Sequence, residues 1–279
     1  MFGYAASLYY ARKWGKPLVL LSLPRARLSS YGYPRPFQLS RFRICSPVRT
    51  ASLIHRFHQT NIKLLRPAVE KCNSRQGIVC LAEPREFAFH PNLNPPEEAK
   101  RIYIRGYWQA YGYAHAMENE LREDLRLRDP ATGRNEEMLG RIQCIETTVS
   151  IHVRRGDYLN VGMSLGASYY RRAIRYMSER FPDATFVFFS DEIEFVRESI
   201  GGPQRAIFVD CNREDAAYED LRLMSACTHH VIANSTFSWW GAWLDSKASK
   251  VVIAPKNWDN SGIQDFSELY PPEWVLIDN

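Results

Sequence analysis

The sequence lacks several features that would place it in a specialised class of protein. It contains no run of about eighteen apolar residues, and the apolar stretch at residues 18–23 is far too short to span a bilayer. Its six cysteines are scattered singly, without a CxxC pair or a Cys/His cluster, so neither a zinc site nor a disulfide framework is indicated. No cleavable signal peptide is recognisable. We therefore expect a cytoplasmic location and reduced thiols.

Acidic residues are scarce in the first 75 positions, where 14 Lys/Arg stand against Glu70 alone. This segment carries +13, and since the whole chain carries +5, the remainder carries 5 − 13 = −8. Such a segment suits peripheral contact with an anionic membrane at its inner face, or with a lipid-linked glycan, although a solvated basic loop explains it equally well. We expect no nucleic-acid partner, because the basic residues form no recognisable recognition helix, zinc finger or aromatic-bearing sheet.

With 279 residues and 45% hydrophobic content, the chain can bury one large core or two medium ones, and we expect two lobes. The first lobe is predicted over residues 1–140 and the second over 141–279. In the first lobe the patterns predict a helix from residue 2, a buried strand at 18–21, an irregular segment at 24–47, short strands at 78–81 and 102–104, and a helix at 113–126. Residues 133–141 are expected to join the lobes.

The second lobe alternates regularly between apolar strands and amphipathic helices. Strands are predicted at 149–153, 185–189, 206–209, 230–233 and 250–253, with helices at 169–180, 192–200, 216–227 and 237–245 between them. Strict alternation with continuously apolar strands predicts an α/β fold with a parallel, doubly wound sheet, the architecture of a nucleotide-binding domain.

The most informative stretch is Ile-His-Val-Arg-Arg-Gly-Asp-Tyr at 151–158, where two arginines follow a predicted strand. Ligands of open α/β sheets bind at the carboxyl ends of the strands, and Gly156 is expected to let the backbone turn sharply there. Arg154 and Arg155 point to opposite faces if both are extended, so one is expected to meet an anion while the other fixes the loop. Asp157 is the expected ion-pair partner of these arginines.

A second stretch, Asn-Ser-Thr-Phe-Ser-Trp-Trp-Gly-Ala-Trp at 234–243, lies between a predicted strand and a helix. Ser235 or Thr236 is expected to cap this helix, and its first amides together with the hydroxyls form a candidate cradle for a diphosphate. The alternative is an ordinary capped helix. The tryptophans are expected to pack against the sheet.

These two stretches, with Tyr-Glu-Asp-Leu-Arg-Leu-Met-Ser at 218–225, Gly-Tyr-Trp-Gln at 106–109 and Phe-Ser-Asp at 189–191, resemble glycosyltransferase family 11. The resemblance is strongest over residues 102–258. It implies two Rossmann-like lobes similar to GT-B, with a parallel doubly wound C-terminal sheet. It also implies a galactoside α-1,2-fucosyltransferase, which moves L-fucose from GDP-β-L-fucose to the 2-hydroxyl of a galactose-terminated glycan with inversion and without a metal. Residues 1–140 are then the acceptor-side lobe and 141–279 the GDP-sugar lobe.

One departure concerns the N-terminus. Family members usually begin with a strand and a Gly-x-Gly-Asn-Gln loop before Met-Phe-x-Tyr-Ala, whereas this sequence starts at Met-Phe-Gly-Tyr-Ala. The first lobe is therefore expected to be truncated. The alternative to an active enzyme is a noncatalytic remnant of the family that binds a GDP-sugar or a glycan.

The expected site residues follow from the leaving-group chemistry of a GDP-sugar, because charge that grows on the β-phosphate must be met by preorganised cations or amides. The second lobe has no Asp-x-Asp motif, so no metal or other cofactor is expected. The catalytic candidates are Arg154, Arg155, Asp157 and His152, and the GDP-fucose-binding candidates are Arg154, Ser235, Thr236, Asn234, Asp191 and Ser190.

Several roles stay open at this level. His152 is expected either to orient the arginines or to lie in the core as a strand histidine. Asp191 suits a contact with donor or acceptor and a helix N-cap equally. Glu219 and Asp220 suit guanine or ribose binding, or a solvated helix face. No general base is identified by the sequence.

Overall fold

The computed structural model describes residues 1–22, 37–52, 66–200, 205–259 and 265–279. Contacts between Cα atoms divide the chain into two compact units. Unit 1 comprises Met1–Ser40, Ile44–Asp124 and Ser267–Leu269, and unit 2 comprises Arg41–Arg43, Leu125–Phe266 and Tyr270–Asn279. The sequence placed the boundary later, at 140/141. The contacts assign 125–140 to unit 2, because the helix in this segment packs against another helix of unit 2.

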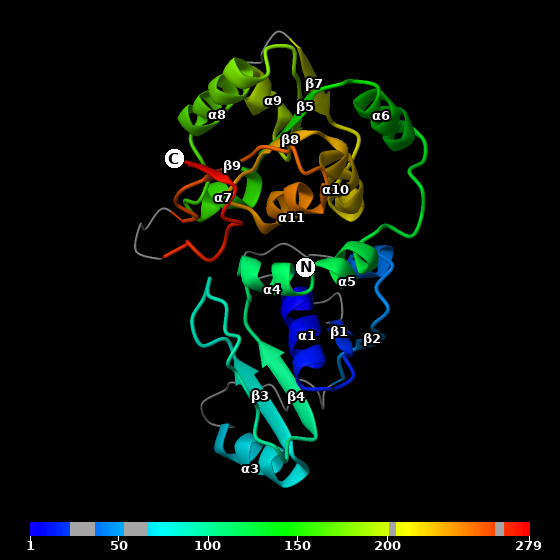
Figure 1. Cartoon of the computed structure of the whole chain (residues 1–279), viewed down its shortest axis with the longest axis vertical. Helices are drawn as coiled ribbons and strands as arrows, with labels where there is room; N and C mark the ends of the chain where they lie inside the picture. The colour runs from blue at the N-terminus through cyan, green and yellow to red at the C-terminus, as the bar shows by residue number, and fades with distance from the viewer. Residues whose placement is uncertain (23–36, 53–65, 201–204, 260–264) are drawn as a thin grey trace. The chain divides into compact units, whose positions relative to one another are not determined.

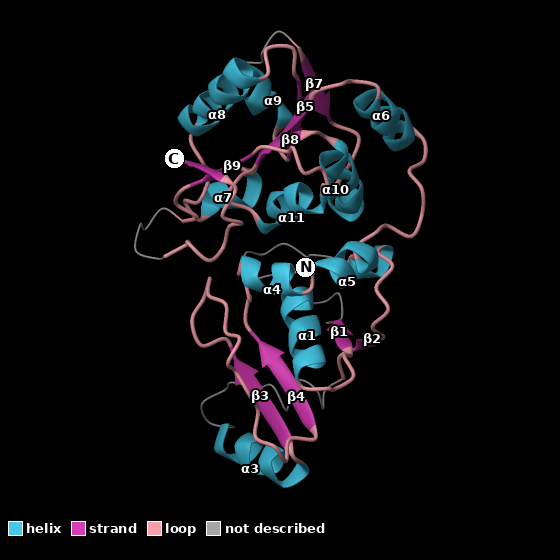
Figure 2. Ribbon diagram, in the orientation of Figure 1, coloured by secondary structure: helices cyan, strands magenta, loops and turns pink. Residues whose placement is uncertain are grey.

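Unit 1 contains short strands and helices. Its elements are α1 (Phe2–Lys13), β1 (Leu20–Ser22), η1 (Leu39–Arg41, whose last residue belongs to unit 2), β2 (Val48–Thr50), α3 (Arg66–Gln76), β3 (Ile78–Ala82), β4 (Arg101–Arg105), α4 (Tyr111–Ala116) and α5 (Glu118–Asp124). Strands β1 and β2 form one parallel pair, and β3 and β4 form another (Figure 2). The described part of this unit thus places the carboxyl ends of β3 and β4 side by side.

Two predictions for unit 1 need correction. The strand expected at 18–21 is β1, and its residues are half-buried rather than buried. The single helix expected at 113–126 is two helices, because Met117 leaves the helical conformation with φ −116° and ψ 23°. Most of the segment predicted to be irregular, 24–47, lies outside the described residues.

An aromatic cluster forms the core of unit 1. Tyr10, on α1, packs with ring centroids 5.5 Å from Trp108 and 5.7 Å from Tyr113, and its hydroxyl lies 3.0 Å from the hydroxyl of Tyr113. All three side chains are almost completely buried. The cluster joins α1 to α4 and to the segment that follows β4.

Unit 2 is built on one six-stranded parallel sheet. Its remaining elements are α6 (Arg134–Gln143), β5 (Thr148–Val153), α7 (Gly156–Asn160), α8 (Ala167–Arg180), β6 (Thr185–Ser190), α9 (Ile193–Phe195), η2 (Val196–Ile200), β7 (Ala206–Val209), η3 (Glu214–Ala216), α10 (Ala217–Ala226), β8 (His229–Val231), α11 (Thr236–Leu244), β9 (Val252–Pro255) and β10 (Val275–Ile277). The strand order is β10-β9-β8-β5-β6-β7, and every pair is parallel (Figure 1). Numbered from β5, this is the order 3-2-1-4-5-6 of the doubly wound dinucleotide-binding sheet. The predicted α/β fold with a parallel doubly wound sheet is confirmed.

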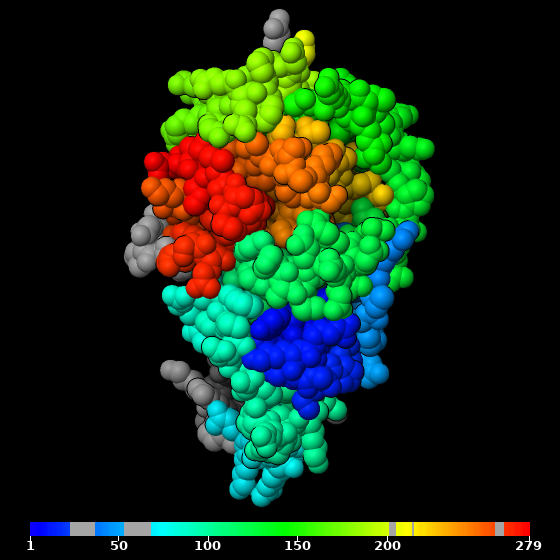
Figure 3. All heavy atoms as spheres, viewed as in Figure 1, coloured from blue at the N-terminus to red at the C-terminus, as the bar shows by residue number. Residues whose placement is uncertain are grey.

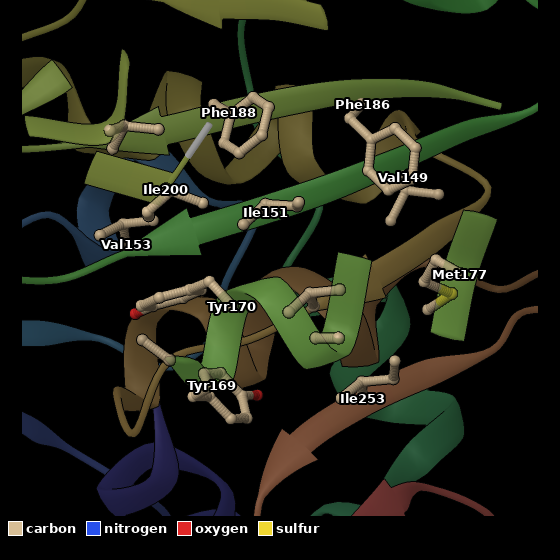
Figure 4. Close-up of a cluster of buried hydrophobic side chains, with 14 of the residues drawn as sticks. Val149, Ile151, Val153, Tyr169, Tyr170, Met177, Phe186, Phe188, Ile200 and Ile253 are labelled. Carbon is tan, nitrogen blue, oxygen red and sulfur yellow. The ribbon is translucent and has the colours of Figure 1, made fainter. Parts of the chain in front are cut away.

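The alternation of side chains along β5 explains how this sheet is covered on both faces. Val149, Ile151 and Val153 point to one face, where they pack with Phe186 and Phe188 of β6 against α8 (Figure 4). Tyr169, Tyr170 and Met177 of α8 complete this cluster. The residues between them, Ser150 and His152, therefore point to the opposite face.

Helices α10 and α11 pack against one another, and α10 also packs against α6. The ring centroid of Trp239, on α11, lies 5.4 Å from that of Trp274, which precedes β10, and the two rings are tilted by 44°. In Figure 3 the red C-terminal segment accordingly lies next to the orange segment that contains α11. The tryptophans of α11 are buried, as predicted.

Several elements of unit 2 differ from the prediction. The segment 133–141, expected to join the lobes, is α6 and is packed on α10. The helix expected at 192–200 is a short α-helix that continues as a π-helix. Helix α7 and strand β10 were not predicted.

No helix among the described residues is both long and apolar enough to cross a bilayer. All six cysteines lie among the described residues, and none of them forms a disulfide.

A buried polar network links β5, β8 and the end of α11. Ser150 Oγ lies 2.8 Å from His230 Nδ1, and His230 Nε2 lies 3.1 Å from Asp245 Oδ2. Lys247 binds the other oxygen of Asp245 at 3.0 Å. The three groups have the order of a serine-hydrolase triad, but each is at most 3% exposed, so no substrate reaches the serine. Burial lowers the pKa of His230, which keeps the ring neutral. The network therefore has a structural role, because it joins β5, β8 and the end of α11.

We predict that Asp245→Ala lowers the free energy of unfolding by about 1–3 kcal/mol, because it leaves the buried His230 ring without its acceptor. Urea denaturation followed by circular dichroism measures the change. Asp183→Ala is the control, because Asp183 is exposed and its ion pair is with the exposed Arg205, and it should change stability by less than about 0.5 kcal/mol. Equal stability of the two variants would contradict a structural role for the network.

Candidate functional site

The strand order indicates where a ligand of unit 2 is expected. Strands β5 and β8 are neighbours, but the chain continues from β5 towards β6 and from β8 towards β9, in opposite directions along the sheet. A crevice opens at such a switch point outside the carboxyl ends of the two strands, and this is the usual ligand position in open α/β sheets. The two stretches singled out in the sequence, after β5 and after β8, border this crevice from its two sides.

Arg154 is the first residue after β5, and two carboxylates hold its guanidinium. Nη2 lies 2.7 Å from Asp157 Oδ1 and Nη1 lies 2.9 Å from Asp191 Oδ2. The Arg154 side chain keeps 28% of its surface exposed, whereas that of Asp157 keeps 6%. The expected ion pair of Asp157 with an arginine is confirmed. Arg154 is thus a preoriented cation that still faces solvent.

Arg155 binds a different set of groups from Arg154. Its Nε lies 3.0 Å from Glu192 Oε2, and its guanidinium carbon lies 3.4 Å from the ring centre of Phe195. Its backbone amide donates to Asp191 Oδ1 at 3.0 Å. Arg155 therefore fastens the loop after β5 to the segment after β6.

Gly156 leaves space for the side chain of Asp191, a role that the sequence did not predict. Its φ is not positive, so the predicted sharp turn does not depend on a left-handed glycine. A Cβ atom at this position would instead lie 2.8 Å from Asp191 Oδ2. The absent side chain makes room for the carboxylate that holds Arg154.

His152 lies in the core, on the face of β5 that α11 covers. It is 6% exposed, and its ring centroid is 5.5 Å from that of Phe237. Burial and the charge of Arg154 lower the pKa of His152 to about 3, so the ring is neutral at ordinary pH. A neutral imidazole adds no positive charge to the site, and the packing favours the core role over a catalytic one.

Asn234 follows β8 closely and acts as a clamp between loops. Its side-chain amide donates to the carbonyl oxygens of Met163 and Trp258, both at 2.9 Å, and the residue is fully buried. The backbone carbonyl oxygen of Asn234 accepts a hydrogen bond of 3.3 Å from the hydroxyl of Tyr158. Tyr158 also lies under the Arg154 guanidinium, 5.7 Å from ring centre to guanidinium carbon. Asn234 and Tyr158 thus position the two sides of the crevice, and the part played by Tyr158 was missed from the sequence.

Ser235 and Thr236 begin α11. Ser235 occupies the N-cap position in extended conformation, but its side chain makes no capping hydrogen bond. Capping by Ser235 is therefore not observed. The N-terminal amides of a helix attract anions, and those of α11 start at the crevice. Ser235 is 6% exposed, whereas Thr236 is half-buried and is the more accessible hydroxyl.

Ser190 ends β6, and its Oγ accepts a bond of 3.0 Å from the amide of Glu192. Asp191 is the next residue, and both of its oxygens are occupied by the loop after β5. Asp191 therefore acts on Arg154 and does not cap a helix. Asp191 and Asp157 are both ion-paired with Arg154, so neither is well placed to act as a general base for a substrate hydroxyl.

The charges around the crevice nearly cancel. Two arginines (Arg154 and Arg155) stand against three carboxylates (Asp157, Asp191 and Glu192), which sum to 2 − 3 = −1. An anionic ligand therefore depends on the orientation of Arg154 and on the amides of α11, not on an excess of positive charge.

A second polar cluster surrounds Asp220, on α10. Asn212 donates to Asp220 Oδ1 at 2.7 Å and also bonds Asn135. Burial raises the pKa of Asp220 to about 6, although the bond from Asn212 acts in the opposite direction. Glu219 is also buried and pairs with Arg222 at 2.7 Å. The solvated helix face offered as one explanation is therefore wrong for Glu219, whereas Asp220 is half-buried.

The comparisons with known proteins agree with the motifs. A model described as Glycosyl transferase family 11 matches residues 95–278, more than half of the chain. The chain belongs to this family. The match contains both stretches that border the crevice, so the predicted family is confirmed.

Individual relatives are moderately similar to this family 11 chain. Alpha-1,2-colitosyltransferase of Escherichia coli is 33% identical over 62% of this chain and 61% of the relative. The O-antigen biosynthesis glycosyltransferase WbnK of Escherichia coli is 28% identical over 99% and 96%. Galactoside alpha-(1,2)-fucosyltransferase 1 of Homo sapiens is 26% identical over 63% and 51%. The chain therefore spans about three fifths of the first relative and half of the third.

Among solved structures, the chain is similar to NodZ alpha-1,6-fucosyltransferase soaked with GDP-fucose. The TM-score is 0.51 over 87% of each chain, with 16% identity. This similarity supports the GT-B-like fold.

We predict that Gly156→Ala weakens the binding of GDP, the ligand expected from the family resemblance, by about tenfold, because the new methyl group displaces the Asp191 carboxylate and frees Arg154. Isothermal titration calorimetry measures the affinity. Gly140→Ala is the matched control, since no atom lies within 4 Å of its added Cβ inside α6, and it should bind GDP as the wild type does. Equal affinities for all three proteins would contradict the role of Asp191.

A further prediction concerns pH. The pKa of Asp220 is raised in the folded state, so its charge destabilises the protein above pH 6, and the penalty shrinks as pH falls towards the ordinary value of 3.8. Asp220→Asn should therefore raise stability at pH 7.5, on the order of 2 kcal/mol, and by less at pH 5. Thermal unfolding at the two pH values tests this. Asp210→Asn, at an exposed partner of Arg134, should show no such pH dependence.

Proposed function

We propose that the protein is an inverting galactoside α-1,2-fucosyltransferase, which transfers L-fucose from GDP-β-L-fucose to the 2-hydroxyl of a galactose-terminated glycan. The observation that carries the proposal is the position of Arg154 at the switch point between β5 and β8, fixed by Asp157 and Asp191. Membership of family 11 and the names of the relatives support the reaction and the linkage.

Arg154 suits the departure of GDP. Charge grows on the β-phosphate oxygen as the bond to the sugar breaks, and a donor already in place stabilises that charge without reorganisation. The two carboxylates hold the planar guanidinium in one orientation, so little side-chain entropy is lost when the diphosphate binds. The amides at the start of α11, with Thr236 beside them, supply donors from the other side of the crevice.

The relatives favour a second donor sugar. The first relative described above is an α-1,2-colitosyltransferase, so GDP-colitose is the alternative donor within the same proposal. A comparison of turnover with GDP-fucose and GDP-colitose separates the two. Binding of GDP without turnover of either donor on any galactoside would instead support a noncatalytic remnant of the family.

We predict that Arg154→Ala lowers kcat by about 10² to 10³-fold, a loss of about 2.7–4 kcal/mol of transition-state stabilisation. Arg154→Lys should not restore activity, because a point charge lacks the planar fork that spans both carboxylates and the phosphate. GDP release on a panel of galactosides measures turnover. The control is Arg205→Ala, which removes an exposed arginine of the same unit and should leave kcat unchanged. Wild-type turnover in Arg154→Ala would overturn the assignment.

We predict that transfer survives an excess of EDTA. Among the described residues, no three His, Cys, Asp or Glu side chains gather as ligands of one metal ion, and the two nearest carboxylates are engaged by Arg154. Loss of activity with EDTA, restored by Mn²⁺ or Mg²⁺, would refute this prediction.

A further inference from the structure

The segment that follows β4 in unit 1 has an unusual backbone. Gly106 has φ +149°, and Trp108 has φ +55°, a left-handed conformation that side chains other than Gly, Asn and Asp rarely adopt. Trp108 is 1% exposed within the aromatic cluster of unit 1. Strain of this kind persists only where the surrounding structure determines it, and it is concentrated at functional sites.

Glu83, the first residue after β3, imposes this conformation. Its Oε2 accepts hydrogen bonds from the amides of Tyr107, at 2.7 Å, and Trp108, at 2.9 Å. A Cβ atom at position 106 would lie 2.5 Å from the same carboxylate, so only glycine fits there. Burial raises the pKa of Glu83, and the two amides act against that rise. A half-buried charge, a glycine and a strained tryptophan thus fix one short turn.

The residue presented by this turn is Tyr107. It is 60% exposed, the highest value among the large hydrophobic side chains described as exposed. Its neighbour Trp108 anchors the backbone in the core, so the backbone of Tyr107 is held while its ring faces solvent. A single exposed aromatic side chain is common on protein surfaces and does not by itself indicate a function. Tyr107 differs, because a carboxylate and a strained neighbour fix its backbone, and such strain is typical of functional sites.

Tyr107 also lies where a sheet binds its ligand. Strands β3 and β4 are parallel, with Ala82 opposite Arg105, so Glu83 and Tyr107 stand together just beyond the carboxyl ends of both strands. Unit 2 places Arg154 at the corresponding edge of its own sheet. Unit 2 holds the side chain of Arg154 and unit 1 holds the backbone of Tyr107, in each case at the end where ligands of parallel strands bind.

We propose that Tyr107 is the stacking platform for the acceptor sugar, with Glu83 as the residue that positions it. The inference rests on the proposed function and adds an acceptor contact in unit 1, where the sequence offered no site residue. One face of a galactose ring presents C–H groups, which pack against an aromatic face, while the hydroxyls stay hydrated. A tyrosine suits this contact because its large ring has few rotatable bonds and loses little entropy when it is covered.

The test separates acceptor binding from donor binding. Tyr107→Ala should raise the KM for a galactoside acceptor at least tenfold, with the KM for the donor and the affinity for GDP within twofold of wild type. Tyr107→Phe and Tyr107→Trp should keep an acceptor KM near that of wild type, because each restores a ring. The melting temperature should be unchanged in all three, since the side chain is exposed.

Two further variants complete the design. Phe37→Ala removes another exposed aromatic of unit 1, 38% exposed, and should leave the acceptor KM unchanged. Glu83→Ala should raise the acceptor KM as Tyr107→Ala does, because the turn is no longer held. An acceptor KM for Tyr107→Ala within twofold of wild type, or an equal loss with Phe37→Ala, would overturn the inference.

A direct binding experiment distinguishes failure of the Tyr107 inference from failure of the proposed function. Saturation-transfer NMR with methyl β-galactoside and lactose reports acceptor binding without turnover. Binding that depends on Tyr107 in a protein that uses neither GDP-sugar would uphold the platform and refute the transferase. Absence of binding to either galactoside, in a protein that binds GDP, would refute the platform alone.

Discussion

The ion pairs of Arg154 are the constraint on which the candidate site depends. One guanidinium is held by Asp157 from the helix that follows β5 and by Asp191 from the end of β6, so three segments meet at a single group. Removing either carboxylate leaves Arg154 with one counter-ion, so the guanidinium is no longer held from two sides. Arg155 supports this arrangement in two ways. Its backbone amide donates to the same Asp191, and its side chain forms an ion pair with Glu192, the residue that follows Asp191. The orientation of the cation is therefore a property of the whole sheet edge.

Each unit holds one group in place at the carboxyl end of a strand, but the interactions that hold it differ. In unit 2 a charged side chain is fixed by opposite charges, whereas in unit 1 the backbone amides beside Tyr107 are fixed by one carboxylate. Both devices stand beyond the carboxyl ends of parallel strands. In each case a group on one strand end immobilises a group on the neighbouring strand end.

Much of unit 2 could be predicted from sequence because the information is local. The short apolar runs around Val149, Phe186 and Ile207 are rich in β-branched and aromatic residues, which favours buried strands, and the polar residues between the helices mark the loops. The parallel sheet and the position of Arg154 at a strand end follow from this pattern. The break at Met117 and the packing of α6 on α10 depend on tertiary contacts, so no local signal revealed them.

The details of the site were less predictable because they join residues far apart in sequence. Gly156 was expected to serve a turn, but it makes room for Asp191, 35 positions away in the chain. His152 was a candidate for catalysis, yet its burial against Phe237 is visible only once α11 is placed. Glu83 carried no signal at all, since its two bonds go to backbone amides.

The near-cancellation of charge at the switch point bears on how the protein meets its ligand in solution. An open cluster of arginines attracts phosphates over about 10 Å, and added salt screens that attraction. Here the arginines are already matched by carboxylates, so little long-range field reaches a dissolved nucleotide. Recognition then begins only at contact, through hydrogen-bond geometry. Under the proposed function, we expect such a site to depend little on ionic strength and to select a diphosphate by its shape rather than by its charge alone.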